Sequence, residues 1–220
     1  ASPQIINESI YNNTFSSTPG TFGNGFNAFL FTEGASQNLR VFNNLFIGDP
    51  TNVNYGREMW LFVNTCNLGV CTNSTGAVVV NNTLLFSSGS FAIQTFGGGG
   101  NSGGIYENNV MSNFATFGDF RASTTPTIDY NYYEIGFPTG NSFWYVGATS
   151  TNDFPTWKGT GSDTHGFYSP STSFVNNDGT LKAGAPAINT GINLTSLGIA
   201  ALNSDRNGAP RPVSGSWTMG

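Results

Sequence analysis

Two acidic side chains occupy equivalent places in similar stretches of the sequence. Glu107 lies in Tyr106-Glu-Asn-Asn-Val-Met111 and Asp129 lies in Ile128-Asp-Tyr-Asn-Tyr-Tyr133, each two residues before an Asn. If these stretches are adjacent strands of one sheet, their carboxyl groups lie about 5 Å apart. That spacing suits a Ca²⁺ site or the acid and nucleophile of a retaining glycosidase. The equivalent positions elsewhere are not acidic, so we prefer two exposed carboxylates on an outer face.

A second pair of candidates is Asp163 and His165. The chain has one His, and an imidazole beside a carboxylate can act as a base. A structural role in the terminal part of the chain is nevertheless favoured. The sequence has no Gly-x-Ser-x-Gly turn, no phosphate-binding loop and no pair of His spaced for a metal.

The other charged groups are expected to be structural. Asp119 with Arg121, and Arg57 with Glu58, read as surface ion pairs. In the terminal segment, a buried pairing of opposite charges is expected among Asp205, Arg206 and Arg211.

Aromatic side chains offer a different kind of site. Flat exposed rings stack on sugar faces, and rings are dense near the end of the repeats. The alternative is that the rings pack the core and cap. The carbohydrate-contact candidates are Trp144, Tyr145 and Trp157.

Two cysteines, Cys66 and Cys71, lie five positions apart with Gly69 between them. We prefer a loop disulfide, which would place the protein in an oxidising compartment; two free thiols are the alternative. A zinc site would need two more ligands.

The composition limits which classes of binding partner are expected. Only 9% of the residues are charged, 14% are aromatic, and the net charge is −5. Without a basic cluster, nucleic acid is not an expected partner. No apolar run approaches the roughly 20 residues of a spanning helix, so membrane insertion is not expected. Abundant Asn and Gly favour β-structure with tight turns.

An irregular repeat predicts the fold. Five segments align on an Asn, and the intervals between these Asn are 31, 38, 27 and 22 residues. A fixed motif separated by variable lengths is typical of a β-solenoid, whose loops tolerate insertions. The aligned residues, expected to form a hydrogen-bonded ladder at a corner, are Asn13, Asn44, Asn82, Asn109 and Asn131.

The residues around the ladder support this prediction. The positions three before and two after each Asn are apolar in all five segments, as internal columns of stacked strands would require. We predict an all-β chain folded as a right-handed parallel β-helix with a C-terminal capping segment, and an antiparallel sandwich is the alternative. The expected organisation is coils over 1–133, a loop-rich excursion and last coil over 134–173, and a cap over 174–220.

The second half of the chain also resembles a known family. Its order of motifs over residues 105–220 is similar to the C-terminal part of bacterial β-helix proteins of the "choice-of-anchor Q" type, in the pectate-lyase-like superfamily. The matching stretches are Phe154-Pro-Thr-Trp157, Gly161-Ser-Asp-Thr-His165, Phe174-Val-Asn-Asn-Asp-Gly-Thr-Leu181, Gly184-Ala-Pro-Ala-Ile-Asn-Thr-Gly191 and Asp205-Arg-Asn-Gly-Ala-Pro-Arg-Pro212.

The resemblance implies secretion or a cell-surface location and a polysaccharide context, but no particular activity. Family members carry further coils before the first one here and continue beyond Trp217-Thr-Met-Gly220, so a longer parent chain is expected. The expected function is a non-catalytic module for display, assembly or glycan contact, with self-association through the solenoid ends. The alternative is a polysaccharide lyase or glycoside hydrolase. No cofactor is expected for the module, whereas the enzyme alternative leaves room for Ca²⁺.

Overall fold

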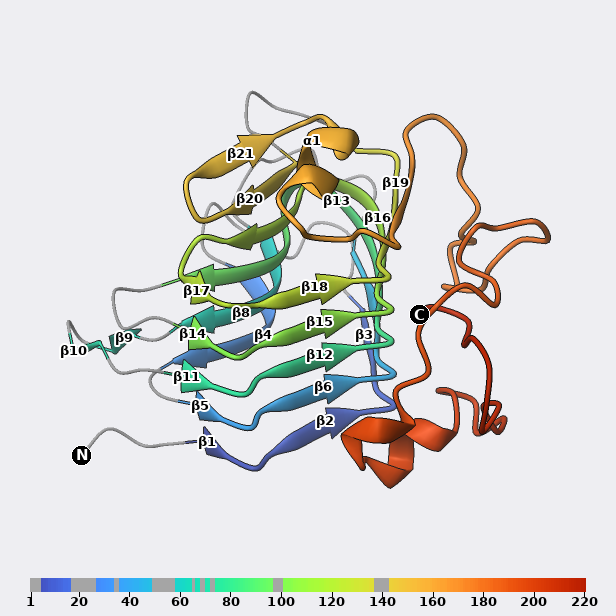
Figure 1. Ribbon diagram of the computed structural model, residues 1–220, viewed down its shortest axis with the longest axis horizontal. Coiled ribbons are helices and arrows are strands. Elements are labelled where there is room, and N and C mark those ends of the chain that lie inside the picture. The colour runs from blue at the N-terminus through green and yellow to red at the C-terminus, as the bar shows by residue number, and fades with distance from the viewer. Residues whose placement is uncertain are drawn as a thin grey trace.

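The chain is almost entirely β-structure. The computed structural model describes the backbone of residues 5–16, 27–33, 36–48, 58–64, 66–67, 70–71, 74–96, 101–136 and 143–220. Within them, helix is limited to α1 (Phe154–Gly159) and two 3₁₀ turns at Thr195–Leu197 and Ala200–Asn203. Figure 1 shows short strands stacked in layers, with α1 at one end of the stack.

Two of the sheets take one short strand from each of five repeats. The first has the order β1-β5-β11-β14-β17, with strands Ile5–Ile6, Ser36–Gln37, Ser74–Thr75, Asn101–Ser102 and Ser123–Thr124. The second has the order β2-β6-β12-β15-β18, with strands Ser9–Tyr11, Arg40–Phe42, Val78–Val80, Ile105–Glu107 and Thr127–Asp129. All the pairings in both sheets are parallel.

A third sheet is longer and also mostly parallel. Its central strands β13 (Thr83–Phe96) and β16 (Val110–Phe120) pair with each other, and β20 with β21 makes an antiparallel hairpin. The other strands are β3 (Thr14–Ser16), β4 (Asn27–Glu33), β7 (Leu45–Ile47), β8 (Glu58–Asn64), β19 (Tyr132–Glu134), β20 (Trp144–Val146), β21 (Thr149–Thr151) and β22 (Phe167–Ser169).

Left-handed residues turn the chain between the sheets. Each repeat has one before the second sheet and one after it, at φ between 52° and 66°. Asn and Gly adopt this conformation with the least strain, which explains why they recur at the corners. The corner after the second sheet has Asn12, Asn43, Asn81, Asn108 and Tyr130.

The next residue at this corner points inward and forms a ladder. Asn13, Asn44, Asn82 and Asn109 each donate from Nδ2 to Oδ1 of the ladder residue in the following repeat, over 3.1–3.2 Å. The five Asn aligned in the sequence therefore stand in one column. The side chains also donate to backbone carbonyls, as Asn82 does to Val41, so the buried corner is satisfied.

The apolar columns of the repeat face the interior. Strand register pairs Val41 with Val79 and Phe46 with Leu84, and these residues are at most 1% exposed. Tyr106 and Tyr133 continue the two columns in later repeats, again at most 1% exposed. The end of the stack near α1 is covered by an aromatic cluster that includes Trp144, Phe154 and Trp157.

The terminal segment is placed differently from the prediction. Residues 174–220, here called the C-terminal arm, were expected to cap an end of the stack. Instead the arm runs beside the corner after the second sheet (Figure 1), and the outward amides of the left-handed Asn hold it. Asn43 donates to Ser204 O, Asn81 to Thr218 O and Asn108 to Ile192 O. These amides face outward because the left-handed residue precedes the inward ladder residue.

The two cysteines belong to a small hairpin. Strands β9 (Cys66–Asn67) and β10 (Val70–Cys71) are antiparallel, and their register sets Cys66 opposite Cys71. The side chains lie outside the described residues, so the disulfide stays a prediction.

Candidate functional site

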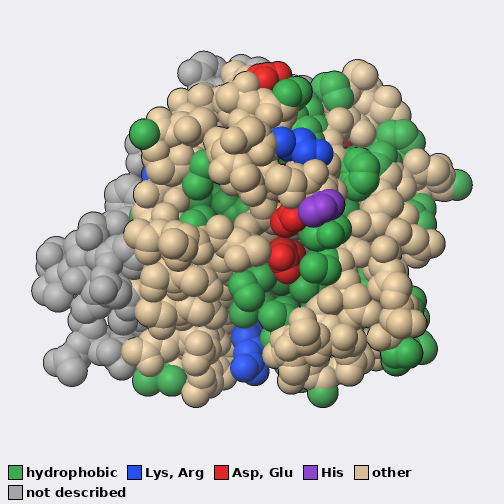
Figure 2. Space-filling model, in the orientation of Figure 1, with side chains coloured by type: hydrophobic (Ala, Val, Ile, Leu, Met, Phe, Trp, Pro, Cys, Tyr) green, Lys and Arg blue, Asp and Glu red, His purple; other side chains and the backbone are tan. Residues whose placement is uncertain are grey.

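The candidate site lies on the outward column of the second sheet. Strand register stacks Tyr11, Phe42, Val80, Glu107 and Asp129 in successive repeats. The arm covers two members of this column, Phe42 and Val80, which are buried in one cluster with residues of the arm such as Leu202 and Trp217. The acidic members Glu107 and Asp129 follow them in the next two repeats. Figure 2 shows acidic side chains next to the single His on this face.

Glu107 is more enclosed than the sequence indicated. The pair was expected to be exposed, but Glu107 is only 8% exposed. The arm explains the difference: Ile192 exchanges two hydrogen bonds with the adjacent Asn108, which brings the arm against this strand. Among the described residues, the Glu107 carboxyl has no hydrogen-bond or ion-pair partner. Burial, and then the charges of Asp129 and Asp163, raise its pKa to about 7.

Asp129 has the opposite environment. Its Oδ1 accepts from the backbone N–H of Tyr130 and of His165, and its Oδ2 accepts from Thr164 Oγ1. Partial burial acts to raise the pKa of Asp129, but the hydrogen bonds from His165 and Tyr130 outweigh it and hold the pKa below its usual value. Two neighbouring carboxyls are thus pushed toward different protonation states.

His165 completes the cluster. Its Nδ1 lies 2.7 Å from Asp129 Oδ2, while its side chain is 59% exposed. The ring stacks on Tyr130 with 4.5 Å between ring centroids. Tyr130 replaces the corner Asn of the earlier repeats and keeps the left-handed conformation at φ 55°, which is strained for a bulky residue. An imidazole held at Nδ1 by a carboxylate keeps Nε2 available as an acceptor.

Asp163 has a structural position instead. It is fully buried and adds a rung to the ladder, since its Oδ1 accepts from the Asn131 amide at 2.9 Å. Its Oδ2 accepts from Tyr133 and from the Trp157 indole. Burial raises the pKa of Asp163, and these hydrogen bonds oppose that rise. With both oxygens occupied in the interior, Asp163 is not placed to take a proton from a substrate.

The aromatic candidates are mostly inside the protein. Trp144 and Trp157 are 0% exposed, so neither ring is presented to a sugar; both pack in the cluster at the end of the stack. Tyr145 is partly exposed, and the Arg121 guanidinium lies 4.4 Å from its ring centroid. This correction follows from the need to cover the aromatic core at that end.

The expected ion pairs differ from one another. Asp119 is buried and binds the more exposed Arg121 at 2.7 Å. Arg57 lies outside the described residues. The buried pairing expected for the arm is not formed: Asp205 instead accepts from backbone N–H groups of its own turn. Arg211 binds the carbonyl of Leu202 and the amide of Asn43, so backbone groups take the place of a carboxylate partner.

The sequence indicated the two acids but not the third member of the cluster. His165 was weighed with Asp163, two residues away, whereas it binds Asp129, 36 residues away. The overlooked signal is Phe167-Tyr168, which pairs in register with Tyr132-Tyr133 and so marks a further repeat. Aligning that repeat would have put the loop of His165 beside Asp129.

Comparison of the chain with protein-family models, curated proteins and solved structures finds no match. Among the described residues, no group of three or more His, Cys, Asp or Glu is arranged to hold a metal ion. No helix in the described part of the chain is long and apolar enough to cross a membrane.

Proposed function

We propose that the chain is a right-handed parallel β-helix module of a secreted or cell-surface protein, and that its cluster of Glu107, Asp129 and His165 cleaves a glycan by acid–base catalysis. The fold part rests on five repeats that feed the same parallel sheets and share one Asn ladder. The location rests on the family resemblance and on the expected disulfide between Cys66 and Cys71, which would form in an oxidising compartment.

The observation that carries the activity is the split between two adjacent carboxyls. Glu107, whose pKa is raised to about 7, keeps its proton in about half of the molecules at neutral pH, while the lowered pKa of Asp129 leaves that group ionised. Titratable neighbours with separated pKa values are the usual arrangement of an acid and its complementary base. Glu107 is also the buried carboxyl without a described partner, which leaves its proton available to a ligand.

The cluster supports hydrolysis by a single displacement. Glu107 donates its proton to the glycosidic oxygen as the bond to the anomeric carbon breaks. Nε2 of His165 takes a proton from the water that attacks that carbon, and Asp129 stabilises the imidazolium through Nδ1. The proton from Glu107 stays on the released sugar hydroxyl; His165 then loses its proton to solvent and Glu107 takes one up from solvent, which restores both groups. Asp129 is not the nucleophile, because donors occupy both its oxygens. The product should therefore have the inverted anomeric configuration.

The test is an assay of the purified chain against neutral and uronic-acid polysaccharides, with product configuration followed by NMR. Turnover should fall at least about 100-fold in Glu107→Gln and in His165→Ala, the scale of one acid or base group. Glu8→Gln, which alters an exposed carboxyl of the first repeat, is the matched control and should be unchanged. No turnover, or turnover equal in all three variants, would contradict the activity.

A second candidate, display and assembly, is supported by the first repeat. Strands β1, β2 and β3 each have a described partner on one side only, and Ile6 and Tyr11 are 47% and 44% exposed. Such edges with apolar side chains favour pairing with a further strand, from a second copy or from a preceding part of a longer chain. Concentration-dependent sedimentation that Ile6→Lys abolishes, together with inactive protein, would favour this function over the first.

A further inference from the structure

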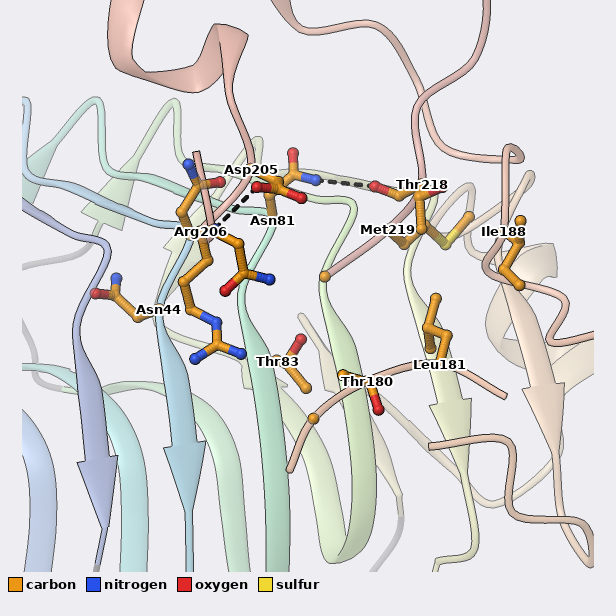
Figure 3. Close-up of a pocket in the computed structure, with 14 residues that line it drawn as sticks. Asn44, Asn81, Thr83, Thr180, Leu181, Ile188, Asp205, Arg206, Thr218 and Met219 are labelled. Carbon is orange, nitrogen blue, oxygen red and sulfur yellow. Dashed lines mark hydrogen bonds between the residues drawn. The ribbon is translucent and has the colours of Figure 1, made fainter. Parts of the chain in front are cut away.

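A cavity of about 210 Å³ lies between the repeats and the C-terminal arm (Figure 3). The repeats contribute Asn81 and Thr83, and the arm contributes Asp205 and Arg206 among others. Leu181 and Met219 supply an apolar part of the wall. None of the acid–base cluster lines this cavity, so it is a separate place on the molecule.

Three side chains in the wall keep unused hydrogen-bonding capacity. Thr83 is 7% exposed, and its hydroxyl, shown in Figure 3, has no described hydrogen-bond partner. Asp205 uses Oδ1 for two backbone N–H groups of its turn, and no described group donates to its Oδ2. Arg206 donates from Nη1 to Thr14 and retains its other N–H groups. The hydroxyl of so enclosed a residue, with no protein partner, is free to bind a ligand or a water.

The charges in the wall favour a neutral ligand. Asp205 and Arg206 are adjacent and of opposite sign, and the Arg206 charge also acts on Asp178. A net positive pocket for an anion is therefore not formed. A carboxylate oxygen and a guanidinium at one site suit hydroxyl groups, which both donate and accept.

The size of the cavity fits one sugar ring. At about 30 Å³ for each water in the liquid, the volume corresponds to about seven waters. That is close to the six ring atoms of a pyranose and less than a whole hexose, so the ring fits and part of its substituents stays in solvent. The apolar side chains of Leu181 and Met219 can meet the C–H face of such a ring. We infer that this cavity binds one neutral monosaccharide unit through Thr83, Asp205 and Arg206.

The inference is tested by saturation-transfer NMR with D-glucose, D-galactose and D-mannose, and with galacturonate and sulfate as anionic probes. At least one neutral sugar should bind, with a dissociation constant in the millimolar range expected of a single small ligand. Thr83→Val keeps the side-chain shape and removes the hydroxyl. Asp205→Asn keeps the Oδ1 acceptor and replaces Oδ2 with a donor. Each of these two variants should raise the dissociation constant of the sugar at least about fivefold, the effect of losing one hydrogen bond.

Glu107→Gln is the matched control, because it alters the acid–base cluster and should leave this binding unchanged. That control separates failure of the cavity from failure of the proposed hydrolysis. A thermal unfolding midpoint for each variant establishes that it is folded, and Thr83→Val decides the matter if Asp205→Asn unfolds. Binding of the anions alone, no binding of any neutral sugar, or equal binding by wild type and Thr83→Val would overturn the inference.

Discussion

Buried carboxyls in this protein differ in what binds them, and this difference separates structure from chemistry. Glu134 is fully buried and receives hydrogen bonds that include those of Ser112, Tyr132 and the Phe174 N–H. Such a saturated carboxylate holds the arm to the repeats. Glu107 has no described donor, so its neutral form is favoured over a buried, unpaired charge.

Glu107→Gln should change the pH dependence of stability. The folded pKa of about 7 lies above the ordinary 4.5. The resulting stability is full below about pH 4.5 and is lost as pH rises toward 7. The variant cannot ionise there. Its free energy of unfolding relative to wild type should rise by about 3 kcal/mol between pH 4 and pH 8. Urea unfolding at both pH values measures this; an equal difference at both would contradict the raised pKa.

The proposed hydrolysis should have an alkaline limit set by the same group. Because Glu107 must be protonated to donate, kcat/KM should decrease tenfold per pH unit above about 7. Asp129, whose pKa is lowered, imposes no limit in this range. A pH–rate profile from 5 to 9 is the measurement. Residual activity of Glu107→Gln should be flat across that alkaline limb, and a wild-type profile without the limb would reject Glu107 as the acid.

Among the structural elements, the ladder links the repeats through side chains as the strands do through the backbone. Replacing Asn82 by Ala removes its donation to Val41 O and Asn109 Oδ1, and the acceptor for Asn44. The groups left behind are buried, so we expect a loss of about 1–3 kcal/mol in urea unfolding. Asn13→Ala, at the exposed start of the ladder, should cost less than half as much. Equal costs would contradict this view of the ladder.

Much of the repeat could be predicted from sequence, because equivalent positions of stacked strands have similar surroundings and so need similar residues. Those residues then recur along the chain. The ladder Asn and the apolar columns were found in this way. The enclosure of Glu107 and the contact of His165 with Asp129 could not, since they depend on where a non-repeating segment docks. The same holds for Trp144 and Trp157: composition reveals their rings, but burial follows from which end of the stack needs covering.

For the whole molecule, the C-terminal arm determines which outer surfaces meet solvent. Trp217 is fully buried against Phe42 and Val80, and the Arg211 guanidinium lies 5.1 Å from its ring centroid. Trp217→Ala should cost about 3–5 kcal/mol. Because these contacts join the arm to the repeats, limited proteolysis should cleave within 191–220 before the repeats. Val213→Ala, at an 89% exposed position, is the control and should match wild type. Simultaneous cleavage of repeats and arm would contradict a separable arm.

The attachment of the arm also limits how the protein can change in length. Stacked repeats can in principle be gained or lost by duplication, because each one presents the same edge to the next. The arm does not repeat, yet its backbone carbonyls at Ser204, Thr218 and Ile192 accept hydrogen bonds from the corner amides of three consecutive repeats. Deleting the 27 residues from Asn82 to Asn108 would join Asn81 to Asn109 and so preserve the corner sequence. It would, however, remove one of these three hydrogen bonds. The arm can therefore bind all three amides only while these three repeats stay consecutive, so a repeat inserted or removed among them should cost the arm at least one of these hydrogen bonds.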